Sequence, residues 1–370
     1  MYHAAWRRDI LGLVGCSVHA LIVATGLSAA CGHVGFDDQS PLPPAGSNSQ
    51  AAPQACFTAA FPAVAFPDPG VDLAVAATPD GVAVIWAPLA IGDLTGLTLD
   101  TQWTLATGPF VVKAGSYSGT GAAYLDNALE LAELEAGGNV KFDVASNDLT
   151  TLVVDEFGCP SGTTVSKQAL LHAGADSVAA TGWDNGMTVT GYDSGWNETD
   201  EMTVTTAAPV AVTATDGMGT ADAYVAWTDG AACDIQDVAN ASTMGSLQAY
   251  TSECTAPRIA AVPAGLAIAF QDSTSVELSV EPFGTIVPMP LASGASSPRL
   301  AYDGTRLWFA YLDASGHAVI GQLSNATTPL ATQTSFTPAA SAFELVAIGS
   351  DVWLFTADAV GMTATMFCLP

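Results

Sequence analysis

A repeated unit of about 44 residues constrains the fold more than any other feature of the sequence. Each unit contains a short apolar strand, a turn with Gly or Asp, and a second β-rich strand that ends in an aromatic residue. The closing aromatics are separated by 44, 43, 41 and 44 residues: Trp183, Trp227, Phe270, Tyr311 and Phe355. Short segments rich in Val, Ile, Thr and aromatics, punctuated by Gly, Asp and Asn, favour strands over helices. The chain is therefore predicted to be an all-β repeat protein.

This pattern resembles the blades of β-propellers. Trp86 lies 97 residues before Trp183, so one more unit is expected between them, with Tyr124 as the candidate aromatic of its second strand. In that unit, segment 128–138 could form an alternating strand or a short helix. Residues 56–370 then divide into seven units of 45 residues, a usual length for a four-stranded blade. We predict a seven-bladed β-propeller, with six or eight blades as alternatives.

The first strand of such a domain can complete the last blade of the ring. The last repeat supplies three strands before the sequence ends, and segment 56–66 stands alone before the first repeat. We therefore expect 56–66 to fill the outer position of the last blade. This arrangement would bring Cys56 near Cys368, and we predict a disulfide between them.

A second disulfide is predicted between Cys233 and Cys254, inside the fourth blade, which leaves Cys159 unpaired. Five cysteines allow fifteen arrangements of two bonds, so other pairings stay open. Buried, reduced thiols are the alternative.

The N-terminal segment has the pattern of an export signal. Two arginines precede an uncharged apolar run from 10 to 30 that ends in small residues. The stretch Leu27-Ser28-Ala29-Ala30-Cys31 resembles the lipobox of bacterial lipoproteins. That resemblance implies a signal peptide over 1–30, lipidation of Cys31, and a cell-envelope protein held in the outer membrane, facing the periplasm or the cell surface. Plain secretion, an uncleaved membrane anchor and twin-arginine export are the alternatives.

A Pro-, Gly- and Ser-rich tether is expected over 31–55, between the lipidated cysteine and the propeller domain over 56–370. This segment carries no apolar periodicity, which is typical of a flexible linker. The folded domain would then stand clear of the lipid headgroups.

The charge balance excludes some partners. The chain has 36 Asp and Glu against 8 Lys and Arg, a formal net charge of −28. Such a surface has few cations to neutralise phosphates, so nucleic acid and unassisted docking on anionic lipid are disfavoured. We expect a monomer whose partners are the membrane, through the lipid anchor, and a protein or a glycan.

No catalytic motif is found in the sequence. The segment GSYSG places tyrosine where a nucleophile elbow needs serine, and neither a histidine cluster nor a phosphate-binding glycine pattern is present. The leading hypothesis is a non-catalytic binding or scaffolding module. A propeller glycan hydrolase or lyase and a calcium-dependent adhesion or spacer protein are the alternatives.

Two arginines form the best candidate ligand site. Arg258 and Arg299 each follow a proline and occupy the same place in successive repeats, at the start of the innermost strand. In a propeller they would stand side by side at the central channel, where paired guanidinium groups suit a carboxylate or an acidic sugar. In the alternative interpretation, each arginine pairs with an acid on a neighbouring blade.

The acidic segment 192–201 is a candidate calcium site, with oxygen ligands from Asp193, Asn197 and Asp200. It lacks EF-hand spacing, and a solvated acidic loop is the alternative. No other cofactor is expected.

Overall fold

The computed structural model describes residues 53–61, 71–88, 92–125, 128–135, 140–151, 157–158, 165–173, 176–183, 186–192, 198–205, 212–216, 223–228, 232–239, 243–252, 254–263, 265–281, 289–323, 333–339, 342–357 and 361–368. All of them lie in one compact unit, Ser49–Pro370. Among them, no helix is long and apolar enough to cross a membrane.

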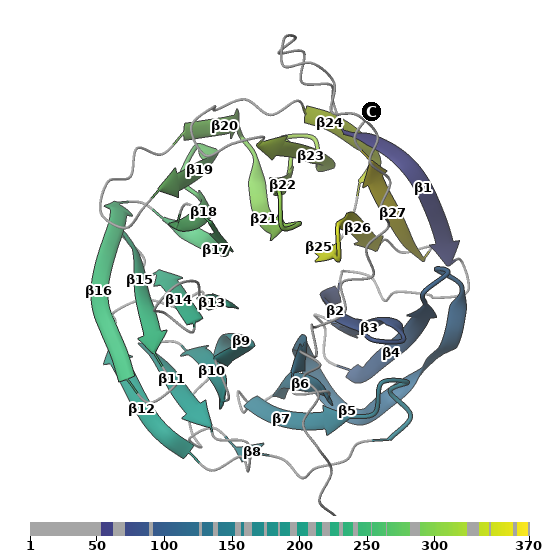
Figure 1. Cartoon of the computed structure of the whole chain (residues 1–370), viewed down its shortest axis with the longest axis horizontal. Helices are drawn as coiled ribbons and strands as arrows, with labels where there is room; N and C mark the ends of the chain where they lie inside the picture. The colour runs from purple at the N-terminus through teal and green to yellow at the C-terminus, as the bar shows by residue number, and fades with distance from the viewer. Residues whose placement is uncertain are drawn as a thin grey trace, which may run out of the picture. The chain divides into compact units, whose positions relative to one another are not determined.

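The described strands form five four-stranded sheets and one seven-stranded sheet, all antiparallel and arranged around a common axis (Figure 1). Blades one and two share β2 (Val71–Thr78), β3 (Gly81–Pro88), β4 (Gly92–Asp100), β5 (Leu105–Leu125), β6 (Ala128–Glu135), β7 (Val140–Ala145) and β8 (Phe157–Gly158). Blade three contains β9 (Val165–Ala173), β10 (Asp176–Trp183), β11 (Gly186–Tyr192) and β12 (Glu198–Thr205). Blade four contains β13 (Val212–Asp216), β14 (Ala223–Thr228), β15 (Ala232–Ala239) and β16 (Thr243–Ser252).

The remaining three blades follow the same plan. Blade five contains β17 (Thr255–Val262), β18 (Gly265–Gln271), β19 (Ser275–Glu281) and β20 (Met289–Ser293). Blade six contains β21 (Ser296–Tyr302), β22 (Leu307–Leu312), β23 (His317–Leu323) and β24 (Gln333–Ala339). Blade seven contains β25 (Ala342–Ile348), β26 (Asp351–Ala357), β27 (Met362–Cys368) and the N-terminal β1 (Gln54–Phe61).

Strand β5 belongs to two blades, which is why blades one and two form one sheet. Its first half pairs with β4 and its second half pairs with β6, and Tyr117 at the junction pairs with both. When β5 is counted in each blade, the described strands make seven blades of four strands. The predicted all-β propeller is confirmed.

Blade two departs most from the predicted pattern. Segment 128–138 contains strand β6, not a helix. Tyr124 lies on β5, and not on the second strand of the blade, which is β6. The expected aromatic is therefore missing from this second strand.

The ring closes through its inner and outer strands. The innermost strands β2, β5, β9, β13, β17, β21 and β25 contact one another in this order, and β25 contacts β2 again. At the outside, β1 pairs antiparallel with β27, as predicted from its isolated position in the sequence. Cys56 and Cys368 are bonded there, with their Cα atoms 5.6 Å apart.

The hydrophobic core lies between the blades. Five clusters of buried side chains join neighbouring blades: seven to one, one to two, four to five, five to six and six to seven. The second strands are covered on both faces, so β22 reads as the continuous apolar run LWFAYL and is buried over Leu307–Tyr311. The closing aromatics mark these second strands because a covered strand has room for large apolar side chains.

The recurring aspartates cap turns. Asp272 and Asp313 follow second strands, and Asp100 is the last residue of β4. In each case Oδ1 accepts hydrogen bonds from two backbone amides of the turn that follows. These carboxylates therefore stabilise turns in blades one, five and six.

Candidate functional site

A bulge at the start of the innermost strand positions both candidate arginines. In β17 and β21 one extra residue interrupts the pairing just before Arg258 and Arg299. Ala256 and Ser297, at these bulges, have left-handed φ angles of 47° and 56°, which are uncommon for residues other than glycine. The proline that follows each of them is tolerated, because a bulge does not need its amide. The repeat therefore builds the two arginines in the same way.

Arg299 is neutralised by an acid on the next blade. Its Nε donates a hydrogen bond to Glu344 Oε2 at 2.9 Å, and its guanidinium lies 4.9 Å from the ring centroid of Phe343. Both partners belong to β25 of blade seven, so the alternative interpretation, pairing with a neighbouring blade, applies to this arginine.

Arg258 differs from Arg299 although the two have the same local structure. Within the described part of the chain, it makes no ion pair, and its one hydrogen bond runs from Nη1 to Pro257 O at 2.9 Å. Arg299 makes the equivalent bond to Pro298 O, also at 2.9 Å. The partly buried Arg258 guanidinium therefore keeps donor groups that no described residue engages.

The charges around Arg258 form a compact group, which we call the inner charged cluster: Asp72, Arg258, Arg299 and Glu344. Burial and the neighbouring Arg299 charge lower the pKa of Arg258 to about 10, while Glu344 and Asp72 act in the opposite direction. The guanidinium remains charged at neutral pH. The structure therefore brings the two predicted arginines into electrostatic contact, and it adds two acids that the sequence analysis did not assign.

Both acids of the inner charged cluster have protein partners. Glu344 accepts from Arg299, and its Oε1 accepts from Leu345 N at 3.2 Å. Asp72, near the start of β2, accepts from the backbone amide of Thr120 on β5 at 3.0 Å. Of the two arginines, Arg258 is the one with capacity for an added anion.

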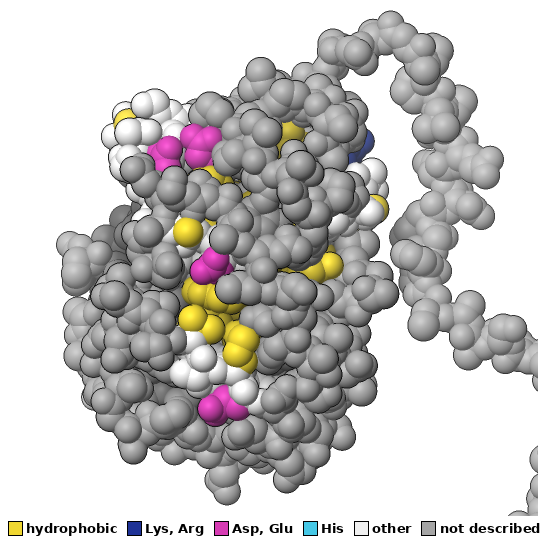
Figure 2. Space-filling view, turned by 90° about the vertical axis from the view of Figure 1, so that its left-hand side faces the viewer, with side chains coloured by type: hydrophobic (Ala, Val, Ile, Leu, Met, Phe, Trp, Pro, Cys, Tyr) yellow, Lys and Arg dark blue, Asp and Glu magenta, His cyan; other side chains and the backbone are white. Residues whose placement is uncertain are grey.

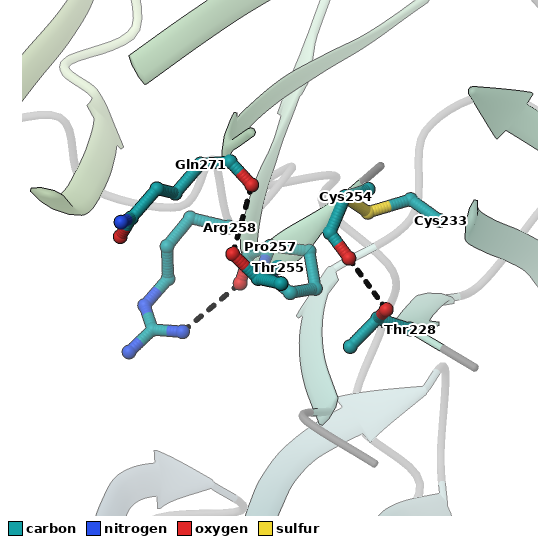
Figure 3. Close-up of a disulfide and its surroundings, with 7 residues drawn as sticks. All are labelled: Thr228, Cys233, Cys254, Thr255, Pro257, Arg258 and Gln271. Carbon is teal, nitrogen blue, oxygen red and sulfur yellow. Dashed lines mark hydrogen bonds between the residues drawn. A yellow bond between two sulfur atoms is a disulfide. The ribbon is translucent and has the colours of Figure 1, made fainter. Parts of the chain in front are cut away.

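The second disulfide holds the segment that leads to Arg258 (Figure 3). Cys233 on β15 is bonded to Cys254, which lies between β16 and β17, with Cα atoms 5.3 Å apart. The predicted pair is therefore bonded, but it joins blade four to the residue just before β17, the first strand of blade five, and does not lie wholly within blade four. Thr228 Oγ1 donates to Cys254 O at 2.6 Å. Thr255 Oγ1 donates to Gln271 O at 2.8 Å (Figure 3). These contacts restrain the backbone of Cys254 and Thr255, directly before the bulge.

Several predicted site residues lie outside the described part of the chain: Cys31, Cys159, Asp193 and Asn197. Asp200 lies on β12. Within the described ranges, no group of three or more His, Cys, Asp or Glu side chains could hold a metal ion. The calcium site stays a prediction.

One charged group was not predicted from the sequence. We call it the buried triad: Lys113, Glu133 and Asp143. Lys113 Nζ donates to Glu133 Oε2 at 2.8 Å and to Asp143 Oδ2. The side chains of Glu133 and Asp143 are 0% and 2% exposed, and that of Lys113 is 15% exposed. A signal was present, since each residue interrupts an apolar stretch, in FVVKAG, LAELE and VKFDVA. The three residues lie on three different strands, and Lys113 is 20 and 30 residues from the two acids, so the pattern did not show that they meet.

The fold is similar to that of known β-propellers. The WD40 domain of coronin from Toxoplasma gondii superposes with a TM-score of 0.56 at 15% identity, over 86% of this chain and 89% of that chain. The CNH domain of AfRom2 superposes with a TM-score of 0.52 at 8% identity, over 84% of this chain and 99% of that chain. No family model and no curated protein matches the sequence. At these identities the likeness establishes the propeller fold, and function has to be argued from the residues.

Proposed function

We propose that this chain is an exported, lipid-anchored β-propeller of the cell envelope that serves as a non-catalytic binding or scaffolding module. The single observation that carries the binding role is Arg258, a charged donor in the inner charged cluster without an acid partner among the described residues. The proposed ligand is a carboxylate group on a protein or on an acidic glycan.

The lipobox-like residues before Cys31 support the anchor. Disulfides are rare in the cytoplasm and frequent in exported proteins, so the bonds Cys56–Cys368 and Cys233–Cys254 fit this location. Acylation would supply about 0.8 kcal/mol for each methylene buried in the bilayer, enough for stable attachment with several chains.

Labelling with palmitate tests the anchor. We expect the wild-type chain to incorporate the label and to fractionate with membranes, and the Cys31→Ala variant to do neither. An unlabelled wild-type chain in the soluble fraction would contradict the proposal.

The charge distribution supports binding of an anionic ligand by one local cationic side chain, and not by the protein surface as a whole. On the side of the ring that Figure 2 shows, acidic side chains stand among hydrophobic and neutral ones, and Lys or Arg is visible only at one edge among the coloured side chains. With a net charge of −28, the surface as a whole repels anions. A carboxylate ligand would therefore depend strongly on Arg258.

Calorimetry with glucuronic acid and sialic acid tests the binding role. We expect Arg258→Ala to weaken binding by about 10- to 100-fold, since a charge-assisted hydrogen bond contributes about 1.5–3 kcal/mol. Arg258→Lys should recover only part of the affinity, because an ammonium cannot form the bidentate contact.

Arg306 provides the matched control for this experiment. It lies on the turn between β21 and β22, away from the inner charged cluster, and its backbone amide donates to Asp303. Arg306→Ala should bind like the wild type. Equal affinity of Arg258→Ala and the wild type, or no binding by the wild type, would show that the ligand assignment is wrong.

A further inference from the structure

The buried triad lies where blades one and two meet. Lys113 comes from the first half of β5, which is the outer strand of blade one, whereas Glu133 and Asp143 come from β6 and β7 of blade two. Lys113 Nζ is 5.9 Å from the ring centroid of Tyr117. Tyr117 and Leu131 belong to the hydrophobic cluster that joins these two blades. The charges are therefore held in an apolar setting.

The strand register places both carboxyl groups on one face of the sheet. Leu131 of β6 pairs with Asp143 of β7, and Glu133 pairs with Lys141. Residues two apart on a strand point to the same face, and paired residues share a face, so Glu133 and Asp143 are diagonal neighbours. Lys113 Nζ contacts one oxygen of each of them.

The two carboxyl groups differ in their remaining contacts. Glu133 Oε1 is buried and, in the described part of the chain, has no hydrogen-bond partner. Burial, together with the adjacent Asp143, raises the pKa of Glu133 to about 8, against the effect of Lys113. Glu133 is therefore largely a neutral acid at neutral pH and can donate its proton to Asp143.

We propose that Lys113 and Asp143 condense to form an amide bond between their side chains, with Glu133 as the acid that assists the reaction. The product is an isopeptide cross-link between β5 and β7, two strands that are separated in the sheet by β6.

The reaction balances without any added reagent. Lys113 Nζ passes a proton to a carboxylate of the triad, and the neutral amine attacks Cγ of Asp143. A C–N bond forms, and a C–O bond of Asp143 breaks as Glu133 protonates the departing oxygen. Two of the three ammonium protons leave with that oxygen as one water molecule, and Glu133 recovers its proton. Nothing is oxidised or reduced.

Burial favours the product. An ammonium and a carboxylate lose their hydration in an apolar site, and an amide carries no charge that needs it. The fold also holds the amine against the carboxyl group, so the attack occurs within one molecule and needs no encounter. Burial lowers the pKa of Lys113, but the hydrogen bonds from Nζ to Asp143 and Glu133 outweigh it and raise the pKa overall. The loss of a proton from Nζ is therefore the step that needs an acid–base partner.

Mass spectrometry of the purified full chain tests this inference. Trypsin cuts after unmodified lysine, so an unlinked protein releases peptide 114–141. We expect the wild type not to release it, because Lys113 is blocked, and to give instead a species in which peptide 142–167 is joined to the peptide that contains Lys113. Its mass should be lower than the sum of the parts by one water, and it should resist reduction.

Variants assign the roles. Lys113→Ala and Asp143→Ala should lack the linked species, and Glu133→Gln should lose most of it. The nearby Lys141→Ala variant is the matched control and should keep the link and the loss of water, although trypsin then cannot cut after position 141.

The digest of the wild-type protein shows whether the cross-link is present even if a variant fails to fold. Release of peptide 114–141 from folded wild-type protein would overturn the proposal. So would a loss of water without joined peptides, as in a cyclised aspartate, or a link from Lys113 to Glu133.

Discussion

Replacing Cys56 and Cys368 together with serine is expected to lower the free energy of unfolding by about 5 kcal/mol. The bond closes a loop with a sequence separation of 312 residues, so it removes a large amount of chain entropy from the unfolded state. It also holds β1 against β27, the one place where the first and last strands of the ring pair. Urea denaturation of the oxidised proteins measures the change.

The other disulfide is the matched control. Cys233 and Cys254 are separated by 21 residues, and removing that bond with alanines is expected to lower the free energy of unfolding by about 3 kcal/mol on the same loop-entropy argument. If the closure variant lost less stability than this control, the closing bond would not be the main constraint on the ring.

The pH dependence of stability is expected to depend on Glu133. Its pKa in the folded protein is about 8, above the ordinary value near 4.3 that applies when the chain unfolds. Between these two pH values, Glu133 is ionised in the unfolded chain but still protonated in the folded protein. A rise in pH therefore favours the unfolded state. The stabilisation is therefore complete below about pH 4 and is lost as the pH rises to about 8, by on the order of 5 kcal/mol.

Melting temperatures measured from about pH 5 to about pH 8 test this expectation. The wild type should melt at progressively lower temperature, and Glu133→Gln should flatten the curve because an amide does not titrate there. Glu201→Gln, at an exposed position on β12, should keep the wild-type slope. Burial is the largest cause of the raised pKa of Glu133. Glu133 is equally buried with or without an amide bond between Lys113 and Asp143, so the expectation holds in both cases. Constant or rising wild-type stability over this range would contradict the assignment.

Much of the propeller could be predicted from the sequence because its blades repeat. The second strand of a blade is covered on both sides, so it requires an apolar run, and its closing aromatic recurs at a nearly constant step. Trp183, Trp227 and Phe270 all lie on such second strands. The closure by β1 followed from counting strands, and the pairing of Cys56 with Cys368 followed from the closure.

Blade two could not be predicted in detail because its second strand does not end in a large aromatic residue. Its second strand, β6, contributes Leu129 and Leu131 to the core in place of a large aromatic. The preceding strand runs from blade one into blade two without a turn, so no local signal marks the boundary. Whether two blades share one strand therefore depends on tertiary packing and not on the local sequence.

By itself, the sequence determined the repeat, the strand order and the equivalence of Arg258 and Arg299, because these depend on residues close together in the chain. Only the tertiary structure decided that Arg299 meets Glu344, 45 residues away, while Arg258 has no acid among its described partners. The buried triad depends on the tertiary structure in the same way, since Lys113 and Asp143 are 30 residues apart. Charge pairing acts over a few ångströms in space, and the distance along the chain does not reveal which groups the folded ring brings that close.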